Sequence, residues 1–467
     1  MSEPGAVRLP PVAGAGTRVP VLGGERRYVA LDNAASTPPF EAVLAAVGRA
    51  AEWYGSVHRG AGFKSHRSTD AYESARYAVH RFLRADPERN TVVFTRNTTD
   101  AINHLASSMP LPPGAVVLVS GMEHHSNDLP WRKAARVVHV AAHADGRLDE
   151  QDLTAQLRRH RETVAVLAVT GASNVTGIVN PVHRWARWAH EAGARIVVDA
   201  AQLAPHRPID VRADADPEHL DVVAFSAHKM YAPFGCGALM APASLFRSEE
   251  PYQVGGGTVD TVGLDYATWA ALPDREEAGT PNVLGAIALA AAMQVYAEVG
   301  WEAIQDHERR RTARLLAGLA GVPGLTIYGD ADPAGAAARL GVVAFNLRGT
   351  PHALVAGILA DEWGVGTRSG CFCAHPYLKR LLDLSLADTA KAEQRILVGD
   401  RSGAPGAVRA SLGLQTTDED VDRLVEALGA IAAGQHRSGY RVDRASGMWH
   451  HPDLAMRPVP ESRVQAA

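Results

Sequence analysis

Short apolar runs that alternate with helical patterns constrain the fold of this chain more than any other feature. The runs are rich in Val, Ile and Leu and lie at residues 91–95, 116–120, 137–140, 164–170, 195–199 and 221–225. Strands buried on both faces have nearly continuous apolar sequences, and strands that alternate with helices form parallel sheets. The pattern therefore predicts an α/β fold in which helices cover both faces of a mainly parallel sheet. Ligands of such sheets bind where the strands end.

The pattern changes near residue 300, and four parts of the chain are expected. Residues 1–24 are rich in Gly, Pro and Ala and lack periodicity, which is typical of a flexible leader. Further on, apolar runs at 342–347 and 406–411 predict the strands of a second, α+β domain. The expected division is a leader at 1–24, a large domain at 25–300 whose first residues can pack on the small domain, a small domain at 301–434, and an extension at 435–467.

The composition argues against several classes of partner. The 467 residues are 46% hydrophobic and 21% charged, with a formal net charge of −4 at pH 7. This balance gives no basic field that would attract nucleic acid or an anionic membrane surface. No apolar run has the length of a bilayer span, and the first residues lack the apolar core of a secretory signal. We expect a cytoplasmic protein that acts on small molecules.

A lysine follows the last of the apolar runs. Residues 221–225 lead directly into Ser226, Ala227, His228 and Lys229, so the amine is expected at the edge of the sheet. Burial penalises the ammonium form of lysine. A Schiff base with an aldehyde cofactor removes that penalty and gives the amine a catalytic role. The alternative is an exposed lysine that happens to follow a core strand.

Polar residues also follow two other runs. Thr98 and Thr99 open a helix, where hydroxyl and backbone N–H groups suit a phosphate, although helix capping explains them equally well. Asp199 ends a buried strand and needs a cationic partner there. A protonated pyridine nitrogen is such a partner, and its protonation makes the ring an electron sink. An ordinary ion pair is the alternative.

Amides and imidazoles occur at further strand ends. Asn174 and Gln202 suit hydrogen bonds to a ring hydroxyl or, alternatively, the capping of turns. His124, in the pair His124–His125, suits stacking on a planar cofactor and proton transfer. A histidine pair also suits a metal ion, but a third and a fourth ligand are not evident.

Together these motifs resemble the class V branch of the fold-type I pyridoxal 5'-phosphate (PLP) enzymes, and most closely the Suf-type, or group II, cysteine desulfurases. The resemblance runs from about residue 28 to about residue 428, with its densest motifs at residues 31–36, 57–60, 123–125, 198–202, 226–229 and 278–282. It implies the fold of these enzymes, a mainly parallel seven-stranded sheet with helices on both faces plus a smaller α+β domain.

The resemblance also implies how PLP is bound. Lys229 would form the Schiff base, Asp199 would pair with the pyridine nitrogen, and His124 would stack on the ring and serve in proton transfer. Asn174 and Gln202 would tune the ring hydroxyl. The phosphate would be held by Thr98, Thr99, Ser226 and His228 and, from the neighbouring subunit, by Gly279 and Thr280. A homodimer with its active sites at the subunit interface follows from this last pair.

The substrate carboxylate would be bound by Arg409, with Arg368 and Asn174 assisting. The guanidinium group offers two parallel N–H donors to a carboxylate, which lysine does not. No metal ion is expected at the site.

The loop at residues 368–376 determines the reaction. Cys373 occupies the place of the catalytic cysteine in the group II pattern, where a thiolate attacks the substrate sulfur; a buried structural cysteine is the alternative reading. Cys371 stands where these enzymes commonly have histidine, and the loop is somewhat similar to that of molybdenum-cofactor sulfurases. Three roles of Cys371 stay open: relaying a persulfide, forming a reversible disulfide with Cys373, or packing as a passive small residue.

The predicted function is a PLP-dependent cysteine desulfurase that converts L-cysteine to L-alanine and leaves a persulfide on Cys373 for a sulfur acceptor, either a protein or a small molecule. Fold alone does not fix the reaction. The rival readings are a carbon–sulfur lyase or aminotransferase of specialised metabolism on the same fold, and a PLP-bearing partner protein without turnover. Replacement of Cys373 distinguishes the first rival, because a lyase or aminotransferase does not need this thiol.

Overall fold

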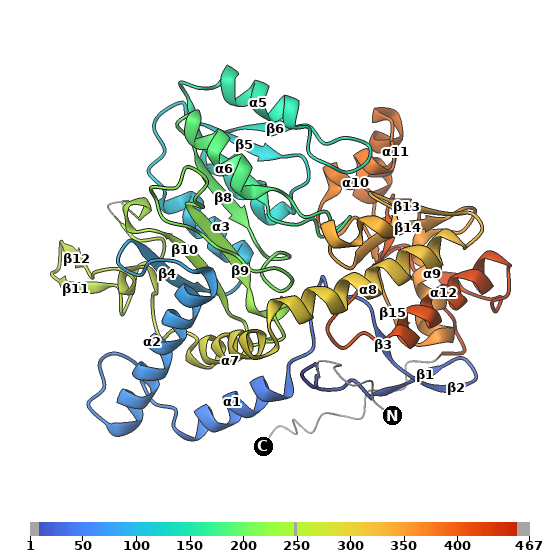
Figure 1. Ribbon diagram of the computed structural model, residues 1–467, viewed down its shortest axis with the longest axis horizontal. Coiled ribbons are helices and arrows are strands. Elements are labelled where there is room, and N and C mark those ends of the chain that lie inside the picture. The colour runs from blue at the N-terminus through green and yellow to red at the C-terminus, as the bar shows by residue number, and fades with distance from the viewer. Residues whose placement is uncertain (1–8, 247–249, 455–467) are drawn as a thin grey trace.

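A computed structural model describes residues 9–246 and 250–454 (Figure 1). Its central sheet has the order β4-β10-β9-β8-β7-β5-β6. Only β10 is antiparallel to its neighbours in this sheet, so the other strands all end at the same edge. The mainly parallel seven-stranded sheet is confirmed. Its strands are β4 (Asn90–Thr95), β5 (Val116–Ser120), β6 (Arg136–Val140), β7 (Val164–Thr170), β8 (Arg195–Asp199), β9 (Val222–Ser226) and β10 (Gly237–Pro242).

Alternate residues of each strand point to opposite faces of the sheet, and each face has its own apolar core. In β5, Val116 and Leu118 belong to one core, whereas Val117 and Val119 belong to the other. The second face is covered by α3 (Thr98–Ser108) and α4 (Leu129–Ala134). The first face is covered by α2 (Phe63–Leu83), α5 (Glu150–Arg159), α6 (Val182–Glu191) and α7 (Val283–Val299), and α1 (Glu41–Glu52) packs against α7.

A second, antiparallel sheet has the order β13-β14-β17-β16 and lies on the right in Figure 1. Val29 and Leu31, from the start of the chain, are buried in its apolar core. The sheet consists of β13 (Leu325–Tyr328), β14 (Val342–Leu347), β16 (Arg368–Gly370) and β17 (Ala407–Ser411). The other elements of this region are α8 (Trp301–Ala320), α9 (His352–Trp363), α10 (His375–Leu381), α11 (Leu386–Leu397), α12 (Asp418–Ala432), and the parallel pair β3 (Val29–Ala30) and β15 (Val365–Gly366).

The expectation of a flexible leader is wrong for part of its length. The strands β1 (Arg18–Val21) and β2 (Gly24–Arg27) form an antiparallel pair, and Val12 makes a β-bridge to Phe40. Val12 and Val21 are buried, and this burial stabilises a segment whose Gly and Pro content suggested a loop. Residues 1–8 of the predicted leader lie outside the described residues.

The expected extension docks on the second sheet's helix α9. The strands β18 (Arg441–Val442) and β19 (Trp449–His450) form a small hairpin, and the backbone N–H of His451 donates to Asp361 of α9 at 3.1 Å. The described residues of the extension, up to residue 454, therefore pack in the region of the second sheet. Its residues 455–467 lie outside the described part of the chain.

One further hairpin, β11 (Val259–Val262) and β12 (Ala267–Trp269), projects at the left edge of Figure 1. It carries the exposed apolar side chains of Val262, Leu264 and Tyr266. None of the described helices is, by itself, long and apolar enough to span a membrane. Taken together, α7 and α8 have the length and the apolar composition of a membrane span, but the two helices are bent by 83° at the break between them.

Candidate active site

A cavity of 240 Å³ opens at the carboxyl edge of the central sheet. The fold explains its position, because the residues after β4, β5, β7, β8 and β9 all meet there. Most of the sequence-predicted site residues line it, namely Thr98, Thr99, His124, Asn174, Asp199, Gln202, Ser226, His228, Lys229, Arg368, Cys373 and Arg409.

Gly279 and Thr280 do not line this cavity. Both are exposed in the single chain. Gly279 has a φ of 79°, and its N–H donates to Gly256 at 2.7 Å. Two buried glutamates just before Gly279 anchor this segment. Glu276 contacts His104 at 2.7 Å, and Glu277 contacts Arg76 at 2.8 Å.

Lys229 lies in the short 3₁₀ turn η2 (Ala227–Lys229) that follows β9. Burial lowers the pKa of Lys229 to about 8, although the charge of Asp199 opposes this shift. Asp199 ends the neighbouring strand β8 and is itself buried. Burial raises the pKa of Asp199, and Lys229 partly offsets that effect. The site thus holds an amine that deprotonates readily and a buried carboxylate in need of a cation.

The start of α3 meets the end of β9 in a cluster of hydroxyl groups. The Oγ of Ser226 accepts from the backbone N–H of Thr98 at 2.8 Å and lies 2.6 Å from its Oγ1. Thr99 makes a similar contact, at 2.6 Å, with Ser126. A helix N-terminus with several hydroxyls suits an anion such as a phosphate. His228, close by, stays neutral because burial and the charge of Lys229 lower its pKa to about 4.

The geometry around His124 fixes its tautomer. Its Nδ1 accepts from the backbone N–H of Ser126 at 3.1 Å. Because that nitrogen is an acceptor, the proton of the neutral ring is on Nε2. Burial, and then the charge of Lys229, lower the pKa of His124 to about 3, so the ring is neutral. His124 therefore offers an N–H donor to the cavity.

Arg409 is almost fully buried, with 2% of its surface exposed. Its Nη2 donates to Asp32 at 2.7 Å, and its Nη1 donates to the backbone carbonyl of Asn174 at 3.0 Å. Its Nε lacks a hydrogen-bond partner among the described residues. Arg368 reaches the same carboxylate at 3.4 Å but is about half exposed. Asp32 belongs to a motif named above, but its contact with both arginines was not predicted.

The thiol loop is held in an unusual backbone conformation. Phe372 and Cys373 have φ values of 52° and 55°, in the left-handed region that residues with a Cβ rarely adopt. The carbonyls of these two residues are held by hydrogen bonds from outside the loop: Asn174 Nδ2 donates to the carbonyl of Phe372 at 2.8 Å, and the N–H of His125 donates to that of Cys373 at 2.7 Å. The loop therefore presents the exposed Cys373 at the mouth of the cavity.

Cys371 lies apart from this arrangement. It does not line the cavity, and its thiol donates to the carbonyl of Pro405 at 3.0 Å. Burial raises its pKa to about 11, which disfavours the thiolate. Of the three open roles, this geometry favours the passive packing residue.

Three of the cavity residues that were not predicted from the sequence make specific contacts in the site. Ser126 bonds both His124 and Thr99, Asn97 caps α3 by accepting from Asp100, and Phe372 places its ring 5.1 Å from the guanidinium of Arg409. Asn97 is the only one with a local signal, because an asparagine before a helical pattern is a common cap. The other two depend on tertiary contacts.

The cavity fits PLP. The hydroxyl cluster at α3 suits its phosphate, Asp199 suits its protonated ring nitrogen, and Lys229 suits its aldehyde. Gln202 gives an independent indication: its Nε2 donates to Ala34 at 2.7 Å, whereas its buried Oε1 has no partner in the described part of the chain. A buried acceptor without a donor is costly, and the ring hydroxyl of PLP would supply the missing hydrogen.

Comparisons with known proteins agree with this site. A model of the class-V aminotransferase family matches residues 29–424. The chain is 37% identical over 420 residues to a cysteine desulfurase of Dickeya dadantii, covering 87% of this chain and 91% of that protein. It is 36% identical over 411 residues to a cysteine desulfurase of Salmonella typhimurium, covering 86% of this chain and 92% of that protein.

Solved structures give the same result. The apo structure of a cysteine desulfurase from Thermococcus onnurineus has a TM-score of 0.76 and 30% identity, covering 87% of this chain and 95% of that one. An Escherichia coli cysteine desulfurase has a TM-score of 0.72 and 32% identity, covering 88% and 96%. The chain belongs to the class-V aminotransferase family, and the resemblance seen in the motifs is confirmed. Enzymes of this family depend on PLP, and so does this one.

Proposed function

We propose that the chain is a cysteine desulfurase that converts L-cysteine to L-alanine and takes up the sulfur as a persulfide on Cys373. One observation carries the proposal: Lys229, Arg409 and Cys373 line the same cavity. An amine for a PLP enzyme and a cation for a carboxylate are common to many amino-acid enzymes. A thiol at the cavity mouth on a strained, hydrogen-bonded loop is what sulfur transfer requires in addition.

Each residue of the cavity suits a different part of the reaction. Arg409 binds the substrate carboxylate through its buried guanidinium, and Arg368 adds charge from the exposed side. When bound, PLP supplies an aldehyde that joins the substrate amine and a ring that withdraws electrons from Cα. Asp199 keeps the ring nitrogen protonated, and Lys229 moves the proton at Cα. His124, with its proton on Nε2, donates a hydrogen bond to the negative charge that develops on the reacting group.

Cys373 then carries out the sulfur transfer. Its thiolate attacks the sulfur of the substrate, the bond from that sulfur to Cβ breaks, and the electron pair left on the carbon side takes a proton to give alanine. The sulfur atom stays on the enzyme as a persulfide, which a reductant releases as sulfide or an acceptor removes. No external oxidant is needed, because the carbon is reduced as the enzyme thiol is oxidised to the persulfide.

We infer that the enzyme is a homodimer whose Gly279 and Thr280 complete the partner's cofactor site. Both residues are exposed in the single chain and are held by the buried Glu276 and Glu277. Large apolar side chains are exposed nearby on the hairpin β11–β12, including Leu264, and burial in a dimer would remove them from water. A cytoplasmic location suits a reactive thiol, which an oxidising compartment would consume.

Product analysis tests the proposed reaction. Purified protein is incubated with L-cysteine and a reductant, beside the Cys373→Ser variant, and alanine, sulfide, pyruvate and ammonia are measured. Equal amounts of alanine and sulfide, both lost in the variant, are expected. Pyruvate with ammonia, or turnover that survives the substitution, would instead identify a lyase or an aminotransferase.

A further inference from the structure

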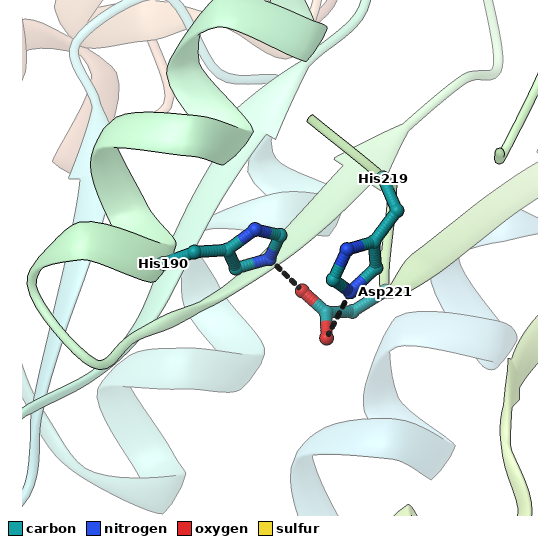
Figure 2. A group of neighbouring side chains, drawn as sticks. All are labelled: His190, His219 and Asp221. Atoms are coloured by element: carbon teal, nitrogen blue, oxygen red, sulfur yellow. Dashed lines mark hydrogen bonds and ion pairs between the residues drawn. The ribbon is translucent and has the colours of Figure 1, made fainter. Parts of the chain in front are cut away.

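Two histidines and a buried aspartate converge in one cluster (Figure 2). The cluster lies at the amino-terminal end of β9, whereas the cofactor cavity lies at the carboxyl ends of the strands. His190 lies in the last turn of α6, and His219 and Asp221 immediately precede β9. At its other end, β9 delivers Ser226 to the cavity. A strand of this length spans roughly 17 Å, so the cluster is separate from the site of sulfur transfer.

The carboxylate lies between the two imidazoles. Asp221 Oδ2 is 2.9 Å from His190 Nε2, and Asp221 Oδ1 is 3.6 Å from His219 Nε2. Figure 2 shows both rings turned toward the carboxylate, and they stack with their centroids 4.2 Å apart. Asp221 is buried, with 3% of its side chain exposed, whereas the histidines are 19% and 18% exposed. Three ligand atoms thus face one another at a place that solvent can reach.

Backbone carbonyls fix the orientation of both imidazoles. His190 Nδ1 lies 2.8 Å from the carbonyl oxygen of Pro217, and His219 Nδ1 lies 2.7 Å from that of Asp216. A carbonyl only accepts, so each Nδ1 carries a hydrogen, and Nε2 is the ring nitrogen that faces Asp221 in both histidines. Metal-binding histidines are held in the same way, with the outer N–H donated to a carbonyl or carboxylate.

Hydrogen bonds also fix the orientation of the Asp221 carboxylate. Its Oδ2 accepts from the backbone N–H of Ile196 at 2.9 Å, and its Oδ1 accepts from Arg195 at 3.0 Å. One lone pair of each oxygen is therefore used, and the other faces an imidazole. A cation between the three ligand atoms satisfies all of them.

We propose that His190, His219 and Asp221 form a zinc site. Two imidazole nitrogens and one carboxylate oxygen are a ligand set that Zn²⁺ accepts, with water in the remaining position. Arg195 and Ile196 hold the carboxylate from behind, as outer partners of metal ligands do. The ion would join the end of α6 to the segment that leads into β9, and so stabilise the strand whose far end leads into the turn that carries Lys229.

Calorimetric titration of the PLP-loaded, full-length protein with Zn²⁺ tests the site. The measurement uses a Cys371→Ser/Cys373→Ser background, because free thiols also bind Zn²⁺, and omits cysteine and thiol reductants. One ion per chain is expected. His190→Gln and His219→Gln are each expected to weaken binding about tenfold or more, as loss of one ligand or its support does.

His183→Gln is the matched control. His183 also lies on α6 and also places its Nδ1 near a backbone carbonyl, that of Glu218 at 2.8 Å, but it is not part of the cluster. It should bind Zn²⁺ as the background protein does. Equal affinity in all three histidine variants, or no binding to the background protein, would overturn the proposal. If a variant fails to fold, the anomalous diffraction of zinc-soaked crystals of the background protein decides, because a peak must lie between the three side chains.

Discussion

The side chain of Asn174 is expected to govern the rate of sulfur transfer. It donates the hydrogen bond, at 2.8 Å, that holds the carbonyl of Phe372, next to the reactive Cys373. The variant Asn174→Ala removes this bond but keeps the backbone carbonyl of residue 174, which binds Arg409. It thus releases the thiol loop while leaving the carboxylate contact in place.

The magnitude follows from the balance of strain and hydrogen bonding in the loop. A left-handed conformation costs a residue with a Cβ about 1–2 kcal/mol, so Phe372 and Cys373 together store about 2–4 kcal/mol. The two external hydrogen bonds, from Asn174 and His125, return about 0.5–1.5 kcal/mol each. Loss of one bond therefore shifts the loop by about 0.5–1.5 kcal/mol away from the active conformation, which lowers kcat about 2- to 13-fold.

Steady-state alanine formation measures this effect, with cofactor absorbance as a check that PLP is still bound. KM for L-cysteine is expected to change little. Asn180→Ala is the control, because Asn180 is equally buried and donates to the carbonyl of Thr170 at 2.8 Å without touching the loop. The reasoning fails if Asn174→Ala keeps the wild-type kcat, or if Asn180→Ala loses as much.

Three other substitutions test single residues. Cys371→Ser should keep wild-type alanine formation, because the hydroxyl can still donate to the carbonyl that the thiol contacts; loss of turnover would favour a sulfur relay. Arg409→Lys should raise KM about tenfold or more, because lysine lacks the paired donors that bind a carboxylate; an unchanged KM would remove Arg409 from substrate binding. Although burial raises the pKa of Glu308, the charges of His206 and Arg207 lower it to about 2. Its carboxylate therefore stabilises the fold above its ordinary pKa of 4.5, and the stability is lost as the pH falls toward 2; thermal unfolding of Glu308→Gln and wild type should differ at neutral pH and converge in acid.

Much of the central sheet is predictable because its strands are buried on both faces. A strand such as β7 (Val164–Thr170) shows this as an unbroken apolar run, and the functional residues follow from the shared edge. By contrast, β10 (Gly237–Pro242) was not located, because its Gly, Ala, Met and Pro content resembles a loop. It forms through pairing with β4 and β9, which local sequence does not encode.

The parts of the site that escaped prediction depend on distant contacts. Asp32 meets Arg409 across 377 positions of sequence, and no periodic pattern links such residues. The tautomer of His124 depends on the backbone N–H of Ser126, and thus on a turn rather than on a residue type. The motifs therefore indicate which residues gather, whereas their protonation and alignment require the folded chain.

The two roles of Asn174 lead to a prediction about substrate length. Its side chain holds the thiol loop, and its backbone carbonyl holds Arg409, so one residue sets the separation between Cys373 and the carboxylate-binding group. In L-cysteine the sulfur lies a fixed number of bonds from the carboxylate, and L-homocysteine adds one more. We expect the wild type to favour L-cysteine in kcat/KM and Asn174→Ala to reduce that preference, because a loosened loop follows the displaced sulfur. If the ratio of the two kcat/KM values is the same in both proteins, the separation is set elsewhere.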